Sequence, residues 1–180
     1  MKKVIYALFI SIFLISCGGI KTPTGQENIE LPCLGKEFRS NKKYFRAFAT
    51  SLSNNVSGAM QDAEDQAAAT LALQIEKKIK VVSDRYSKSL TEGQKGEYIG
   101  VSERGGRQTA KQVLRNTKII CAKTTRDRKT GMYNYYTVIE VPVDGVMKSF
   151  ANSISQESKS QINLDREKFR KIFDEETGSY

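Results

Sequence analysis

The stretch KIICAKTTRDRKTGMYNYYTVIEVPV, residues 118–143, decides the fold because it carries a complete β-hairpin pattern. Residues 119–125 predict one strand and residues 132–141 predict its antiparallel mate, since both are rich in β-branched and aromatic side chains. Between them, DRKTG supplies turn residues in Asp127 and Gly131, and Pro142 is expected to end the second strand. One face of that second strand is predicted to carry Tyr133, Tyr135, Thr137, Ile139 and Val141.

Upstream of the hairpin, the sequence predicts a strand followed by a long helix. Residues 42–53 alternate in the manner of a strand, and residues 58–89 place apolar side chains at every fourth position. The helical stripe consists of Ala59, Ala63, Ala67, Leu71, Ile75 and Ile79. Its first half is alanine, which lets a helix lie close against a sheet. Residues 91–98 are interpreted as a polar break, and residues 101–116 as a second helix whose start Gly105 and Gly106 weaken.

Downstream, residues 144–155 and 164–176 show the spacing of two further short helices. Strand, long helix, helix and hairpin in this order predict an α+β fold. We expect a small antiparallel sheet with helices packed on one face, followed by C-terminal helices.

The amino terminus has the order of features found in an export signal. Lys2 and Lys3 precede the uncharged run Val4–Ile15, whose helix of roughly 18 Å is shorter than the ~30 Å bilayer core. The residues that follow, Leu14, Ile15, Ser16 and Cys17, resemble the lipobox of bacterial lipoproteins. This resemblance implies cleavage before Cys17 and an N-acyl diacylglyceryl lipid on that residue. An ordinary signal peptide or an uncleaved amino-terminal anchor are the alternatives.

The lipobox interpretation divides the chain into four parts. Residues 1–16 form the signal peptide, 17–35 a lipidated cysteine and flexible tether, 36–150 the α+β domain, and 151–180 a helical C-terminal extension. Two or more acyl chains hold a protein stably on a membrane. Gly18 stands where inner-membrane lipoproteins carry aspartate, and no acidic residue precedes Glu27. By analogy, we expect the outer membrane, facing the periplasm.

The order of lipobox, YFRAFATS strand, alanine-stepped helix and VLRNTKIICAKTTRDRKTGMYNYYTVIEVP hairpin resembles the LPP-twenty lipoprotein family. The domain of that family is similar to the amino-terminal domain of the flagellar T-ring protein. The resemblance covers Tyr44 to Lys148 and departs from the family at Ala49, where glycine is common. It implies a non-catalytic domain on an outer-membrane lipid anchor, used for binding, assembly or envelope structure, with no catalytic residues to carry over.

The chain has three cysteines, and lipidation of Cys17 would leave two. An oxidising periplasm permits a disulfide between Cys33 and Cys121. Sequence alone does not bring the two together, so a pair of buried thiols is the alternative.

Catalytic chemistry has little support in the composition. The chain contains no histidine, which removes the commonest general base and the commonest metal ligand. The two remaining cysteines have no zinc-site spacing, and Gly105 and Gly106 match no phosphate-binding motif. We expect neither enzyme activity, metal nor cofactor beyond the lipid. A hydrolase or transferase with a histidine-free active site stays open as a lesser alternative.

A basic stretch could bind a partner. The chain carries a net charge of +9, and residues 104–129 hold nine basic side chains against one acid, Asp127. In a helix, one stripe would contain Arg107, Lys111, Arg115 and Lys118. Such a stripe suits lipid head groups, acidic glycans or an acidic protein face, and a merely solvated helix is the alternative. We expect the membrane and an envelope protein or a second copy as partners, and not nucleic acid.

Overall fold

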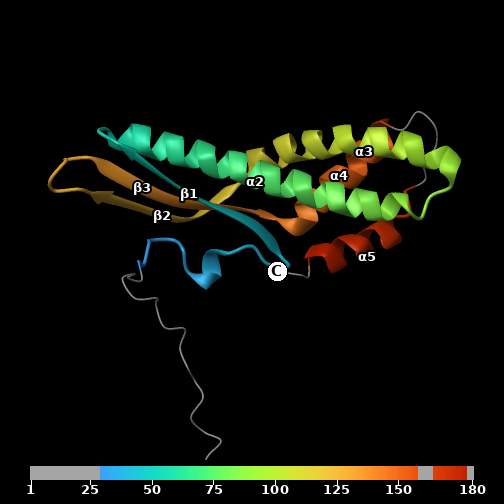
Figure 1. Cartoon of the computed structure of the whole chain (residues 1–180), viewed down its shortest axis with the longest axis horizontal. Helices are drawn as coiled ribbons and strands as arrows, with labels where there is room; N and C mark the ends of the chain where they lie inside the picture. Colours follow the sequence, from blue (N-terminus) through green and yellow to red (C-terminus); the bar gives the residue numbers. More distant parts are fainter. Residues whose placement is uncertain (1–28, 158–163, 178–180) are drawn as a thin grey trace, which may run out of the picture. The chain divides into compact units, whose positions relative to one another are not determined.

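The computed structural model describes residues 29–157 and 164–177, and the chain divides into two units, Met1–Glu30 and Leu31–Tyr180. The second unit is an α+β fold, as predicted, with helices packed on a small antiparallel sheet (Figure 1). Its strands are β1 (Tyr44–Ser53), β2 (Lys118–Arg126) and β3 (Tyr133–Pro142). Its helices are α2 (Val56–Ser87), α3 (Glu92–Val113), α4 (Val143–Glu157), α5 (Arg166–Thr177), and the 3-10 turns η2 (Lys36–Phe38) and η3 (Leu114–Asn116).

Strand β3 lies in the middle of the sheet, with β1 on one side and β2 on the other. Both pairings are antiparallel, and Phe45 stands opposite Val141 while Ala47 stands opposite Ile139. These four side chains are buried on the face that α2 covers. The alternation predicted for the hairpin therefore holds in the fold.

Helix α2 follows the predicted alanine stripe. Asn55 caps its start by accepting a hydrogen bond from the Ser57 N–H at 2.8 Å. Ala59 and Ala63 are fully buried near the hairpin end, where they pack against Tyr135. The larger Ile75 and Ile79 lie farther along, in the core that α2 shares with the other helices. Each such side chain contributes about 1.5–3 kcal/mol by leaving water.

The polar break predicted at residues 91–98 is wrong, because α3 already begins at Glu92 and ends at Val113. Tyr98 and Val101 are almost fully buried, so tertiary packing on α2 stabilises a segment whose glycines disfavour a helix. Burial also raises the pKa of the Tyr98 phenol well above its usual range.

The two adjacent glycines lie inside α3, and they allow α3 to pack closely between its neighbours. A Cβ at Gly105 would stand 2.5 Å from the Ser153 Oγ on α4, and one at Gly106 would stand 3.2 Å from an Ile79 methyl on α2. The absence of side chains at these positions therefore sets the spacing of three helices.

Replacing Gly105 by leucine is expected to lower the free energy of unfolding by about 2 kcal/mol. Overpacking costs about 3 kcal/mol, and the better helix propensity of leucine returns about 1 kcal/mol. Urea unfolding of the two proteins measures the difference. Gly93→Leu is the matched control, because nothing lies within 4 Å of a Cβ at Gly93 in the same helix. Equal stability of Gly105→Leu and wild type would contradict this packing.

Two predicted domain boundaries need correction. The boundary at 150/151 falls inside α4, whose Phe150 and Ile154 are both fully buried. Phe169 and Phe173 of α5 belong to the same core, so the C-terminal helices are part of the domain rather than an extension. At the other end, residues 31–35, predicted as tether, belong to the folded unit because Cys33 is buried against the sheet.

Candidate functional site

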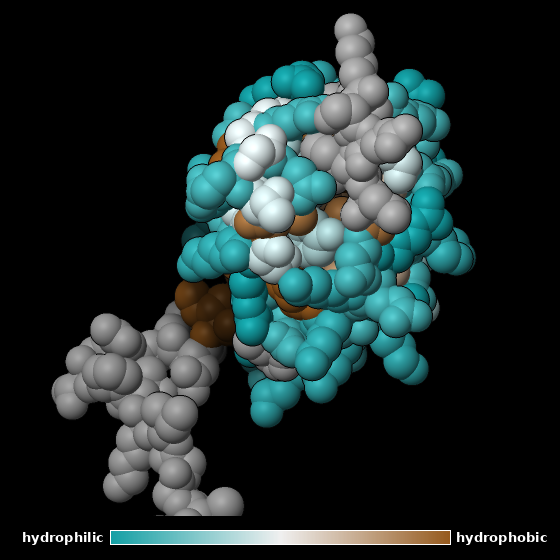
Figure 2. Space-filling model, turned by 90° about the vertical axis from the view of Figure 1, so that its right-hand side faces the viewer, coloured by the Kyte–Doolittle hydropathy of each residue, from teal (hydrophilic) through white to brown (hydrophobic). Residues whose placement is uncertain are grey.

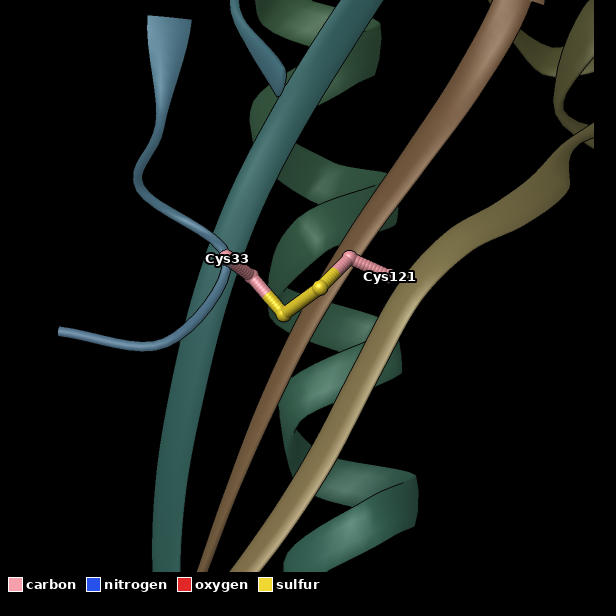
Figure 3. The surroundings of a disulfide bond; sticks show 2 residues. All are labelled: Cys33 and Cys121. Carbon is pink, nitrogen blue, oxygen red and sulfur yellow. A yellow bond between two sulfur atoms is a disulfide. The ribbon is translucent and has the colours of Figure 1, made fainter. Parts of the chain in front are cut away.

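A segment before β1 crosses the face of the sheet opposite α2. We call residues 31–41 the strap. The strap is joined to β2 by a disulfide between Cys33 and Cys121, with a Cα–Cα distance of 5.7 Å, and α2 lies behind the strands (Figure 3). Cys33 adopts a φ of +64°, a conformation uncommon for residues other than glycine. It packs with Tyr136 and Val138 of β3, so the strap gives this face of the sheet a small core of its own.

An ion pair provides a second attachment for the strap. The Nε of Arg46 on β1 lies 2.8 Å from the Glu140 Oε2 on β3, and each side chain is only 13% exposed. The same guanidinium donates to the carbonyl oxygens of Glu37 at 2.7 Å and Arg39 at 3.1 Å. One half-buried cation thus connects both strands and the strap.

The strap also covers the outer edge of β1 at Tyr44 and Arg46. The Arg46 N–H donates to the Ser40 Oγ at 2.9 Å, and that hydroxyl donates to the Arg46 carbonyl at 3.1 Å. The Asn41 N–H donates to the Tyr44 carbonyl at 2.9 Å. Backbone groups that would otherwise be unpaired at a sheet edge are therefore satisfied here.

The opposite edge, formed by β2, is different. Strand β2 pairs with β3, while α2 packs on β1 and β3, and no helix of the described ranges covers β2 to a similar extent. Every residue of β2 is exposed or half-buried, and Ile119 retains 51% of its surface. The strand carries basic side chains and no acidic one, namely Lys118, Lys123 and Arg126. We call this strand's outer side the β2 edge.

The turn that follows β2 adds two more cations. The Asp127 carboxylate accepts hydrogen bonds from the N–H groups of Lys129 at 2.7 Å and Thr130 at 3.1 Å. The Thr130 bond, followed by the Lys129 bond, lowers the pKa of Asp127. Gly131 closes the turn with a φ of +74°, which glycine adopts without strain. Asp127 is therefore used locally, while the side chains of Arg128 and Lys129 are exposed.

The predicted basic stripe does not lie on one helix. Arg107 and Lys111 are exposed on α3, but the helix ends at Val113, so Arg115 lies in η3 and Lys118 begins β2. The chain tightens into a 3-10 turn before entering the sheet, and this breaks the helical spacing on which the stripe depended. The expectation of a single four-residue anion-binding face is therefore wrong in its geometry.

Arg107 lines a cavity of about 320 Å³ between α2 and α3. Three cations and three carboxylates share its lining, among them Lys80, Asp84 and Glu103. This balance of charge does not favour an anionic ligand. Within residues 29–157 and 164–177, no three His, Cys, Asp or Glu side chains are grouped to hold a metal ion.

At the helical end of the domain, hydrophilic residues cover most of the described surface, with apolar residues in small patches between them (Figure 2). That end of the domain thus offers mainly a solvated surface. The β2 edge is the more distinctive feature, because no described segment hydrogen-bonds to its outer backbone groups and its charged side chains are all basic.

The lipidation residue predicted from the sequence, Cys17, lies outside the described residues. In the part of the chain that the structure describes, none of the helices is both long and apolar enough to cross a bilayer.

Sequence analysis did not single out Lys123, Arg126, Arg128 or Lys129 as site residues, although it counted them in the basic stretch. They become a group only because β2 lies at an edge. The sequence signal was the contrast within the hairpin: residues 123–126 of β2 are polar on both faces, whereas Tyr135 and Tyr136 of β3 are buried on opposite faces.

No protein-family model, curated protein or solved structure matches this chain.

Proposed function

We propose that this protein is a non-catalytic binding or assembly module of the bacterial envelope, held on the outer membrane by a lipid on Cys17 and facing the periplasm. Its resemblance to the LPP-twenty lipoprotein family is part of this proposal. The observation that carries it is the Cys33–Cys121 disulfide, which follows the lipobox-like cysteine by 16 residues. Structural disulfides persist in exported compartments and are rare in the cytosol.

The geometry of the strap suits such an anchor. From Cys17 to Cys33 the chain reaches at most roughly 55 Å, so a lipid on Cys17 would keep the sheet near the membrane surface. The disulfide to β2 and the hydrogen bonds from Arg46 of β1 to the Glu37 and Arg39 carbonyls then join this tether to two strands of the domain. A folded unit tied down in this way can present its remaining edge, the β2 edge, to other envelope components.

Two alternatives from the sequence receive less support. Anion binding by one helical stripe loses its basis, because Arg107, Lys111, Arg115 and Lys118 belong to three elements. A histidine-free enzyme has no grouping of side chains to recommend it among the described residues, and we propose no reaction.

Replacing Cys17 by serine is expected to abolish lipidation completely, because serine lacks the thiol that carries the diacylglyceryl group. Intact-mass spectrometry of the membrane fraction should find wild-type protein that begins at a lipidated Cys17. The Cys17→Ser variant should retain residues 1–16 and lack the lipid mass. Cys121→Ser, which removes a different thiol, is the matched control and should remain lipidated. Wild-type protein that begins at Met1, or at an unmodified Cys17, would contradict the proposal.

A further inference from the structure

We propose that the β2 edge binds an extended, acidic segment of another envelope protein, which adds to the sheet as a fourth strand. The envelope location of this partner rests on the proposed function, whereas the pairing itself rests only on the structure of the sheet.

The backbone of β2 provides the first part of the argument. An edge strand presents alternate N–H and C=O groups that another extended chain can pair with. At the opposite edge of the sheet, Ser40 and Asn41 of the strap bind the backbone of β1 at Tyr44 and Arg46. No described segment does the same for β2, which runs for nine residues and is exposed or half-buried throughout. No described segment thus covers any part of the β2 edge, which has one bulge between Ile119 and Cys121, and a strand can add there.

The side chains of β2 determine the charge of the partner. In the register with β3, Lys118 stands opposite Glu140 and Lys123 opposite Tyr136, on the strap side of the sheet, while Arg126 points to the helix side. The carboxylate of Glu140 is already bound by Arg46. An added strand would therefore meet Lys118 and Lys123 on the strap side, and acidic side chains at alternate positions, which share one face of a strand, would pair with these two lysines.

The same side chains disfavour pairing of β2 with the β2 strand of a second copy of this chain. Two β2 strands paired antiparallel about Ala122 would place Lys118 opposite Arg126 at both ends. No register offers an opposite-charge pair, because β2 contains three basic and no acidic residues. Like charges directly opposite one another destabilise strand pairing. Lysines on an edge strand thus oppose self-association while leaving pairing with an acidic strand possible.

The test uses the purified full-length protein in detergent micelles and three fluorescein-labelled peptides, TEVEVET, TKVKVKT and TEPEPET. The first alternates acidic and β-branched residues. The second reverses its charge, and the third keeps its charge while proline removes backbone donors and disfavours pairing. Fluorescence anisotropy should show that TEVEVET binds at least tenfold more tightly than either of the others. Equal binding of TEVEVET and TEPEPET would overturn the proposal, because charge alone would then suffice.

Variants locate the binding on the protein. Lys123→Glu, at an exposed position, is expected to weaken TEVEVET binding about tenfold, since it replaces an opposite-charge pair with a like-charge pair. Lys168→Glu makes the same change at an exposed position of α5 and should leave binding within twofold. Circular dichroism verifies that both variants are folded. Unchanged binding by Lys123→Glu, with the protein folded, would overturn the placement on β2.

Two further measurements test whether the β2 edge binds something other than an acidic strand. Phosphatidylglycerol vesicles test an anionic membrane, and sedimentation velocity tests a second copy. Binding to vesicles but not to TEVEVET would overturn the proposal, and so would a dimer whose stability changes in Lys123→Glu but not in Lys168→Glu. If wild-type protein proved to carry no lipid on Cys17, the proposed function would be refuted. The peptide measurements would still decide whether a strand adds to β2.

Discussion

The double variant Cys33→Ala/Cys121→Ala is expected to unfold with about 4 kcal/mol less free energy than the wild-type protein. The disulfide closes a loop of 88 residues, and its removal restores conformational freedom to the unfolded chain. It also detaches the strap from Tyr136 and Val138, which the strap helps to bury. Guanidinium unfolding of both proteins under oxidising conditions measures the difference.

Wild-type protein treated with dithiothreitol is the natural control for this variant. Its unfolding midpoint should move to that of the double variant, whereas dithiothreitol should not change the variant itself. A difference below 1 kcal/mol between variant and wild type would contradict this contribution of the disulfide to the stability of the fold.

Replacing Phe169 by alanine is expected to cost about 4 kcal/mol of unfolding free energy. This side chain of α5 is 1% exposed and lies in an aromatic cluster. Its ring centroid is 5.4 Å from that of Phe150 on α4 and 5.7 Å from that of Tyr86 on α2. Because alanine leaves a cavity among three helices, urea unfolding should occur at much lower denaturant concentration.

Lys168→Ala is the matched control, one position earlier and exposed. Its effect should stay within 0.5 kcal/mol, as for most surface substitutions. A loss below 1 kcal/mol for Phe169→Ala would mean that α5 is the peripheral extension that the sequence suggested. It would also contradict the contact between α5 and Tyr86, whose hydroxyl oxygen accepts the Asp165 N–H at 2.9 Å.

Local patterns predicted most of the elements correctly. The hairpin was predictable because β-branched and aromatic residues flank an Asp-to-Gly turn, and these preferences act over a few residues. Helix α2 was predictable because its small and aliphatic residues recur at every fourth position from Ala59 to Ile79. In both cases the burial pattern follows directly from the backbone period.

Long-range arrangement accounts for what the sequence did not predict. Glycines at 93 and 96 weaken the local helical signal, and only the burial of Tyr98 against α2 explains why α3 includes them. The predicted basic stripe assumed that the helix continued past Val113. The β2 edge depends on β3 lying in the middle of the sheet, and strand order is a property of the whole fold.

The disulfide also determines how the domain would respond to tension. A pull on the amino-terminal segment enters at Cys33 and passes through a covalent bond to Cys121, so it bypasses β1, α2 and α3. These elements lie inside a closed loop whose contour length, roughly 300 Å for an 88-residue separation, is withheld from extension. Stretched between its ends, the oxidised protein can lengthen only outside that loop. After reduction of the disulfide, unfolding under force would add the contour length of the loop as one measurable step.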